Sequence, residues 1–144
     1  MSRSLLTLAA LLVALVALSA CAERSDTLSS QEVLERASNI DVELPPGRKL
    51  DLPAIRDDMR YGERVPEALV HDVAMCLWME YWLERFEASD MDGAEAAIKG
   101  VSSVAQMEIY SYHDQSYRDY IEAVVDYARD GDSSEVVLFL QSNC

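Results

Sequence analysis

Few residues of this 144-residue chain are suited to metal or nucleophilic chemistry, because it contains only two His and three Cys. In a helix, Met75, Cys76 and Met79 would share about one turn, with His71 one turn earlier. Thioether and thiolate ligands suit copper(I), but methionines at this spacing are more often core packing. A zinc site needs three or four close ligands, and the chain offers two His and one spare Cys in separate predicted helices. We therefore expect no metal site and no cofactor.

Catalytic arrangements of these residues are weakly supported as well. His71-Asp72 and His113-Asp114 are neighbours in the sequence, but adjacent helical residues point to different faces, so we expect neither pair to form a dyad. The sequence has no Gly-x-Ser-x-Gly motif and no glycine-rich phosphate loop. A carboxylate pair for glycoside hydrolysis cannot be selected from 26 acidic residues without geometry. We predict no catalytic residue and a protein that is not an enzyme.

Two acidic segments contain parts of a calcium-loop pattern: Asp90-Met91-Asp92-Gly93 and Asp130-Gly131-Asp132. With either glycine at the sixth loop position, Lys99 or Val137 occupies the twelfth, where a bidentate Glu is required. The pattern therefore favours helix caps and turns over calcium sites.

The first twenty residues have the composition of a secretory signal peptide. They carry one charge, Arg3, and an apolar run from Leu5 to Leu18 that is short for a membrane span. The run leads directly into Leu18-Ser19-Ala20-Cys21, which resembles a lipobox, the signal-peptidase II site of bacterial lipoproteins. The resemblance implies cleavage before Cys21, a diacylglyceryl thioether on its sulfur and a further acyl chain, such as palmitate, on the new amino terminus.

A protein with two or more acyl chains is held durably on a lipid bilayer. The lipobox resemblance thus implies a location in the cell envelope, on the outer side of the cytoplasmic membrane or on the outer membrane of a diderm. Ala22, rather than Asp, follows Cys21 and resembles the pattern of an outer-membrane destination. The family of the mature domain is not evident from its residues.

Two cysteines remain in the mature chain besides Cys21. The exterior of the cytoplasmic membrane is oxidising, so we predict a disulfide between Cys76 and Cys144; two free thiols are the alternative. The long loop that this bond closes would contribute about 4 kcal/mol by chain entropy. The bond would attach the last residue to the middle of the chain.

Proline and aromatic residues divide the mature chain into two parts. All four prolines lie at or before position 66, and all eleven aromatic residues lie at or after position 61. The prolines interrupt regular structure, whereas the aromatic-rich part can build a core. We predict four segments: a cleaved signal peptide (1–20), a lipidated cysteine and tether (21–29), an irregular arm with short helices at 30–39 and 51–59 (30–60), and a helical bundle domain (61–144).

Residues 67–144 contain no proline, and their apolar residues recur at helical spacing. We predict helices at 66–88, 92–112, 117–129 and 133–142, with Ser29, Asp92 and Ser116 at or near helix starts. Gly100 either weakens its helix or admits a neighbouring helix closely. The run 136–140 is partly β-branched, so a strand is the alternative there. The predicted fold is all-α: a small antiparallel bundle of about four helices with an irregular arm, tied by one disulfide.

The chain has a formal net charge of −14, which argues against nucleic-acid binding. We expect a membrane-anchored, non-enzymatic lipoprotein that binds another envelope or secreted protein, basic in charge, through an acidic helical surface. The alternative is a helical lipoprotein that binds a small ligand or a metal, and a cell-wall hydrolase is less favoured. Five tyrosines would either form a recognition surface or lie at the edge of the core: Tyr110, Tyr112, Tyr117, Tyr120 and Tyr127.

Overall fold

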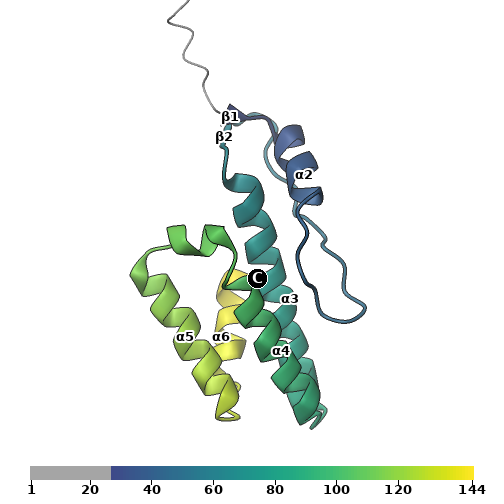
Figure 1. Ribbon diagram of the computed structural model, residues 1–144, viewed down its shortest axis with the longest axis vertical. Coiled ribbons are helices and arrows are strands. Elements are labelled where there is room, and N and C mark those ends of the chain that lie inside the picture. Colours follow the sequence, from purple (N-terminus) through teal and green to yellow (C-terminus); the bar gives the residue numbers. More distant parts are fainter. Residues whose placement is uncertain (1–26) are drawn as a thin grey trace, which may run out of the picture.

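The computed structural model describes residues 27–144, so Cys21 and the lipobox lie outside the described residues. Its helices α3 to α6 form an antiparallel bundle, and an arm runs along one side of α3 (Figure 1). The all-α prediction is confirmed. The elements are β1 (Thr27–Leu28), α2 (Ser30–Ser38), β2 (Tyr61–Gly62), α3 (Val65–Glu87), α4 (Met91–Val104), the 3-10 helix η2 (Glu108–Tyr112), α5 (Gln115–Arg129) and α6 (Ser134–Asn143).

Helix α3 is the centre of the bundle because its middle is apolar on almost every side. Pro66 stands in its first turn, as predicted, where a missing N–H costs nothing. Helices α4 and α6 and the arm all pack against α3, whereas α5 packs chiefly against α6. The buried side chains of α3 are those of Pro66, Val70, His71, Ala74, Met75, Trp78, Met79 and Trp82. No helix within residues 27–144 is both long enough and apolar enough for a membrane span.

The predicted continuous helix over 92–112 is wrong. Helix α4 ends at Val104, and a turn separates it from η2. The backbone of Met107 is extended, with ψ of 141°, which interrupts the helix and lets Ile109 turn into the core. The apolar spacing continues through this break, so the sequence pattern contains no signal of it.

Two predicted caps are also displaced by two residues. The carboxylate of Asp90, not Asp92, accepts the Gly93 N–H at 3.0 Å and begins α4. Asp114 begins α5 by accepting the Tyr117 N–H at 2.8 Å, while the Ser116 hydroxyl donates to the same carboxylate. In both cases a carboxylate two residues before the predicted cap accepts a free N–H group of the first helical turn.

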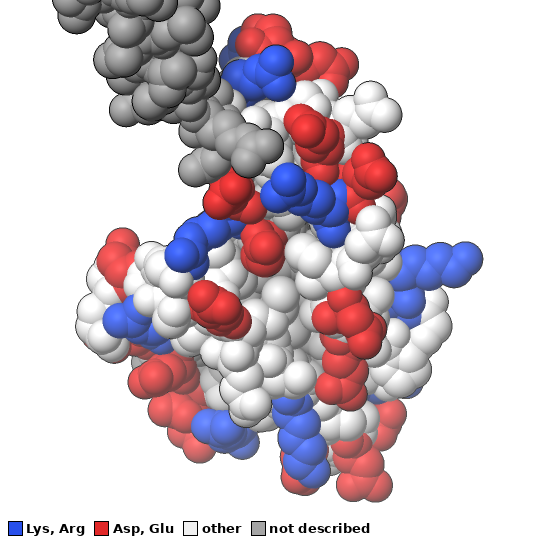
Figure 2. All heavy atoms as spheres, turned by 45° about the horizontal axis from the view of Figure 1, so that its top comes forward, with Lys and Arg blue, Asp and Glu red and all other residues white. Residues whose placement is uncertain are grey.

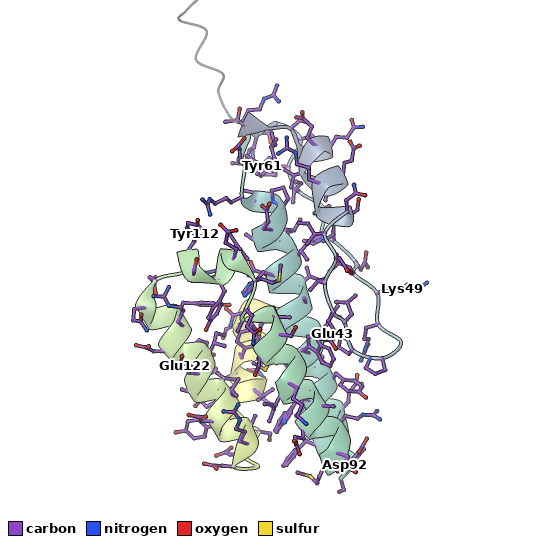
Figure 3. The ribbon with its side chains drawn as sticks, in the orientation of Figure 1. Glu43, Lys49, Tyr61, Asp92, Tyr112 and Glu122 are labelled. Carbon is purple, nitrogen blue, oxygen red and sulfur yellow. A yellow bond between two sulfur atoms is a disulfide. The ribbon has the colours of Figure 1, made fainter. Side chains whose placement is uncertain are left out.

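The arm is irregular from residue 40 to residue 60, and the predicted helix at 51–59 is wrong. Pro53 removes a backbone donor there, and Leu52 and Ile55 are only half-buried, so no apolar face stabilises a helix. The arm is fastened instead by the Trp78 indole, which donates to the Glu43 carbonyl at 3.0 Å. Figure 3 shows Glu43 beside α3 and Lys49 at the outer edge of the loop.

Two local predictions at the ends of the described chain are confirmed. Ser29 and Glu32 form a capping box at the start of α2, and residues 136–140 are helical within α6.

The Cys76–Cys144 disulfide is present and joins the end of α6 to the middle of α3. The short antiparallel pairing of β1 with β2 was not predicted, because two-residue strands leave no periodic pattern.

Candidate metal centre

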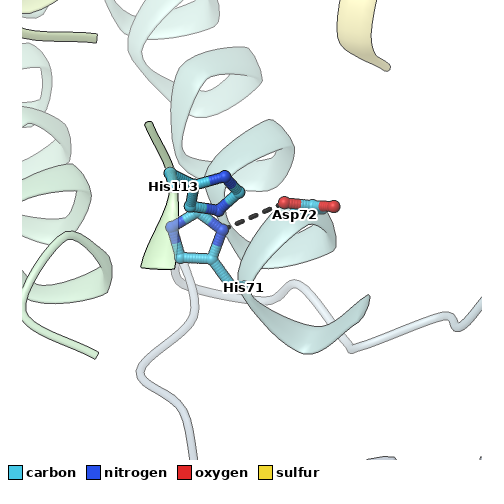
Figure 4. Close-up of side chains that lie close together, drawn as sticks. All are labelled: His71, Asp72 and His113. Atoms are coloured by element: carbon cyan, nitrogen blue, oxygen red, sulfur yellow. Dashed lines mark hydrogen bonds and ion pairs between the residues drawn. The ribbon is translucent and has the colours of Figure 1, made fainter. Parts of the chain in front are cut away.

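Three side chains with metal-ligating groups meet where α3 lies beside the segment after η2. His71 and Asp72 lie in the second turn of α3, and His113 follows η2 directly. One ligand atom from each residue lies within 4.8 Å of the other two. Figure 4 shows the two imidazole rings one above the other, with the Asp72 carboxylate beside them. Two ring nitrogens and a carboxylate oxygen therefore lie close together.

Two buried ring nitrogens of this cluster lack protein partners, while a third is paired. His71 is fully buried, and its Nδ1 lies 3.0 Å from Oδ1 of Asp72. The Nε2 atoms of both His71 and His113 are buried without a hydrogen-bond partner. Buried polar atoms are nearly always paired, so these two nitrogens call for an explanation such as a bound ion or water. The prediction that neither neighbouring His–Asp pair forms a dyad is wrong for His71 and Asp72, whose Nδ1 and Oδ1 atoms lie within hydrogen-bond distance.

The His113 segment is held in place by contacts on both sides of the ring. The Arg118 guanidinium donates to the carbonyl of Ser111 at 3.1 Å and also to that of His113. The Tyr117 ring stacks on the imidazole with centroids 4.3 Å apart, and the Tyr110 ring lies 6.1 Å away. The imidazole is thereby positioned by side chains of η2 and α5.

The electrostatic environment favours a neutral imidazole at position 113. Burial is the main cause that lowers the pKa of His113, and the neighbouring His71 lowers this pKa further. The carboxylates of Asp72 and Asp114 act in the opposite direction without cancelling the effect. A neutral imidazole offers a nitrogen lone pair, which is the form that binds metals. Burial also raises the pKa of Tyr117 to about 12, so its hydroxyl stays protonated.

A small cavity of about 130 Å³ adjoins the cluster. Asp72 and His113 form part of its wall, and the disulfide half-cystine Cys76 forms another part. Its remaining lining comes from Met75, Tyr117, Phe139 and Asn143. None of these lining residues is a Lys or Arg, so Asp72 is the only charged group on the cavity wall.

The structure separates the other residues that the sequence offered for chemistry. Met75 and Met79 are buried in the core, and Cys76 is in the disulfide, so the copper(I) thiolate arrangement is not formed. The acidic calcium-like segments serve as caps, as predicted: Asp90 caps α4, and Asp132 accepts the Ser134 N–H at 2.9 Å.

Most of the five tyrosines lie at the edge of the core. Tyr110, Tyr117 and Tyr120 are partly buried against it, whereas Tyr112 and Tyr127 are about half exposed, at 54% and 46%. Arg64 lies over the exposed Tyr112 ring at 3.5 Å from its centroid, and Figure 3 shows this tyrosine at the upper edge of the bundle.

The approach of His71 to His113 was missed because the two residues lie far apart in the sequence. One signal was present: His71 is a polar residue next to the apolar stretch of a helix that is buried on most sides. A polar side chain in such a place needs a partner from another element.

Neither a known family model, nor a curated protein, nor a solved structure matches this chain.

Proposed function

We propose that the protein is an exported, lipid-anchored envelope protein whose helical body binds a divalent transition-metal ion through His71, Asp72 and His113. One observation carries the metal assignment: three ligating groups from two segments converge within 4.8 Å, and buried ring nitrogens among them lack partners. The function is binding rather than catalysis, in keeping with the absence of a catalytic motif in the sequence.

The donor set fits an ion of the zinc type. Two imidazoles with one carboxylate are a recurrent set for zinc and for other borderline divalent metals. Bonds of about 2.0–2.2 Å place tetrahedral ligand atoms about 3.4 Å apart, so closure around an ion requires movements of at most about 1.4 Å from the described separations. His113 lies between η2 and α5 rather than inside a long helix, so a shift of this size does not require a long helix to move.

The proposed location rests on the lipobox and on the disulfide. Cysteine bonds such as Cys76–Cys144 form and persist outside the cytosol.

Metal binding is tested with the purified protein by competition against a chromophoric chelator, with Zn²⁺ and Co²⁺ as probes. We expect one ion per chain. His113→Gln and Asp72→Asn remove one ligand each and should weaken binding by at least about tenfold. Both residues are at least partly exposed, so these variants are expected to fold, as checked by circular dichroism.

Asp119→Asn is the matched control, because it removes an exposed carboxylate of α5 that is not part of the cluster. It should leave the affinity unchanged. Equal affinities for all four proteins, or less than half an ion bound per chain at saturating Zn²⁺, would contradict the proposal.

A second candidate function is supported by the outer face of α5. Asp119, Glu122, Asp126 and Asp130 are exposed and recur every three or four residues, so their side chains share one face. Figure 3 shows Glu122 in the middle of this helix. On the face drawn in Figure 2, acidic and basic side chains are mixed over much of the surface. The α5 face is therefore where a basic protein partner would bind.

This second function is tested by capture from envelope extract at low and high salt. We expect a basic protein to be retained at low salt and lost when Asp119, Glu122 and Asp126 are all replaced by Lys. A variant with Glu35, Glu87 and Asp92 all replaced by Lys, exposed changes outside α5 that alter the net charge equally, serves as the charge control. Equal capture by both variants would exclude α5 as the binding face.

A further inference from the structure

The metal centre has three protein ligands, one fewer than a four-coordinate ion needs. Within residues 27–144 no fourth His, Cys, Asp or Glu joins the group. The Cys76 sulfur on the cavity wall is bonded to Cys144 and is not a thiolate. Sites with three protein ligands and one open position bind water or an exogenous ligand there, whereas closed structural sites use four protein ligands.

The cavity beside the cluster lies where such a ligand would be accommodated. Two of the three proposed ligands, Asp72 and His113, form part of its wall, so an ion held by them would lie at its edge. Its volume of about 130 Å³ corresponds to roughly four water molecules at about 30 Å³ each. The space therefore suits a ligand of a few atoms.

The charges around the cavity determine whether an anion or a cation would bind there. A divalent ion with one carboxylate ligand and two neutral imidazoles retains one net positive charge. No Lys or Arg lines the cavity, so attraction for an anion comes from the ion itself, and one negative charge completes the balance. The apolar walls, Met75 and Phe139, disfavour a more highly charged species because it would lose its hydration.

We infer that the metal ion keeps one coordination position open toward the cavity under the disulfide, and that a small monoanion binds the ion there. This inference rests on the proposed metal binding. The ligand class is that of azide, formate or thiocyanate, whose donor atom replaces a metal-bound water molecule without any change in oxidation state.

The test uses the full protein loaded with Co²⁺, whose visible absorption bands report coordination number and ligand exchange. Titration with azide and with formate should shift these bands and saturate. The bulky naphthalene-2-carboxylate should bind more weakly than formate, because its ring system does not fit within a cavity of about 130 Å³.

Asn143 provides a variant outside the proposed ligand set. It is exposed and lines the cavity near its mouth. Asn143→Phe should narrow the cavity and weaken azide binding by at least about tenfold while Co²⁺ affinity stays the same. Asn143→Ala is the matched control, which should bind azide as the unaltered protein does.

The outcomes separate the two proposals. Co²⁺ that binds with bands insensitive to azide and formate would overturn the open position and leave metal binding in place. Azide binding that is equal in the Phe and Ala variants would overturn the cavity as its location. Failure of the protein to bind Co²⁺ at all would overturn the metal centre and the inference together.

Discussion

Gly100 of α4 lies directly against the indole ring of Trp78 of α3. A Cβ atom built on Gly100 would lie 2.3 Å from the indole Cδ2 and Cε2 atoms, closer than any real carbon contact. Trp78 is 5% exposed, and its Nε1 is bonded to the Glu43 carbonyl. Of the two explanations that the sequence allowed for this glycine, the close approach of helices is the correct one.

The substitution Gly100→Ala should therefore destabilise the protein, even though Ala is the better helix former. The ring cannot swing aside without breaking its bond to the arm, so we expect a loss of about 1–3 kcal/mol in the free energy of unfolding. Urea unfolding followed by circular dichroism measures it. Gly62→Ala is the control, since no atom lies within 4 Å of its added Cβ; a loss of the same size there would refute the packing argument.

Loss of the Cys76–Cys144 disulfide should lower stability substantially. The bond closes a loop across a sequence separation of 68 residues, for which the chain-entropy account gives about 4 kcal/mol. The double variant Cys76→Ser/Cys144→Ser should unfold at a much lower urea concentration than the oxidised protein. Reductant should lower the urea midpoint of the unaltered protein and leave that of the variant unchanged. A variant as stable as the oxidised protein would show that the bond contributes little.

The metal-free protein should lose stability as the pH falls below neutrality. The pKa of His113 in the folded chain lies below its ordinary value of 6.5, so the unfolded chain takes up this proton first as the pH decreases. The unfolded state then binds more protons, and stability is lost as the pH falls from 6.5 toward the folded-state pKa.

Urea midpoints measured across this pH range, in the presence of a chelator, test that dependence. His113→Gln should reduce the dependence of the urea midpoint on pH near pH 6.5, because the amide does not titrate. An unchanged profile in this variant would assign the effect to other groups.

Replacement of Cys21 by Ser should abolish lipid attachment. Without the sulfur there is no site for the diacylglyceryl group, so the variant should incorporate no radiolabelled palmitate and should remain unprocessed. Globomycin, which inhibits signal peptidase II, should block processing of the unaltered protein only. Processing of the Ser variant at the same position would point to an ordinary secretory signal and leave the protein without an anchor.

Much of the fold could be predicted because its determinants are local. The apolar stripe of α5 and the all-round apolar character of α3 recur within single helical turns, and each identifies its helix directly. The disulfide could be predicted by counting, since the described part of the chain contains two cysteines, Cys76 and Cys144. The interruption at Met107 and the caps at Asp90 and Asp114 could not be predicted as readily, because neighbouring residues such as Asp92 and Ser116 offered equivalent caps.

The candidate metal centre, unlike the helices, depends on contacts between residues that are far apart in the sequence. His71 and His113 were visible in the sequence as lone histidines in separate elements, and nothing in their spacing linked them. Their meeting depends on where α4 ends, because the turn before η2 returns the chain to α3 beside His71. The sequence by itself determined the helical class, the disulfide partners and the expected export signal, all of which rest on composition and short-range spacing. Only the tertiary structure decided which polar groups face one another, because side chains distant in the sequence meet only through the packing of whole helices.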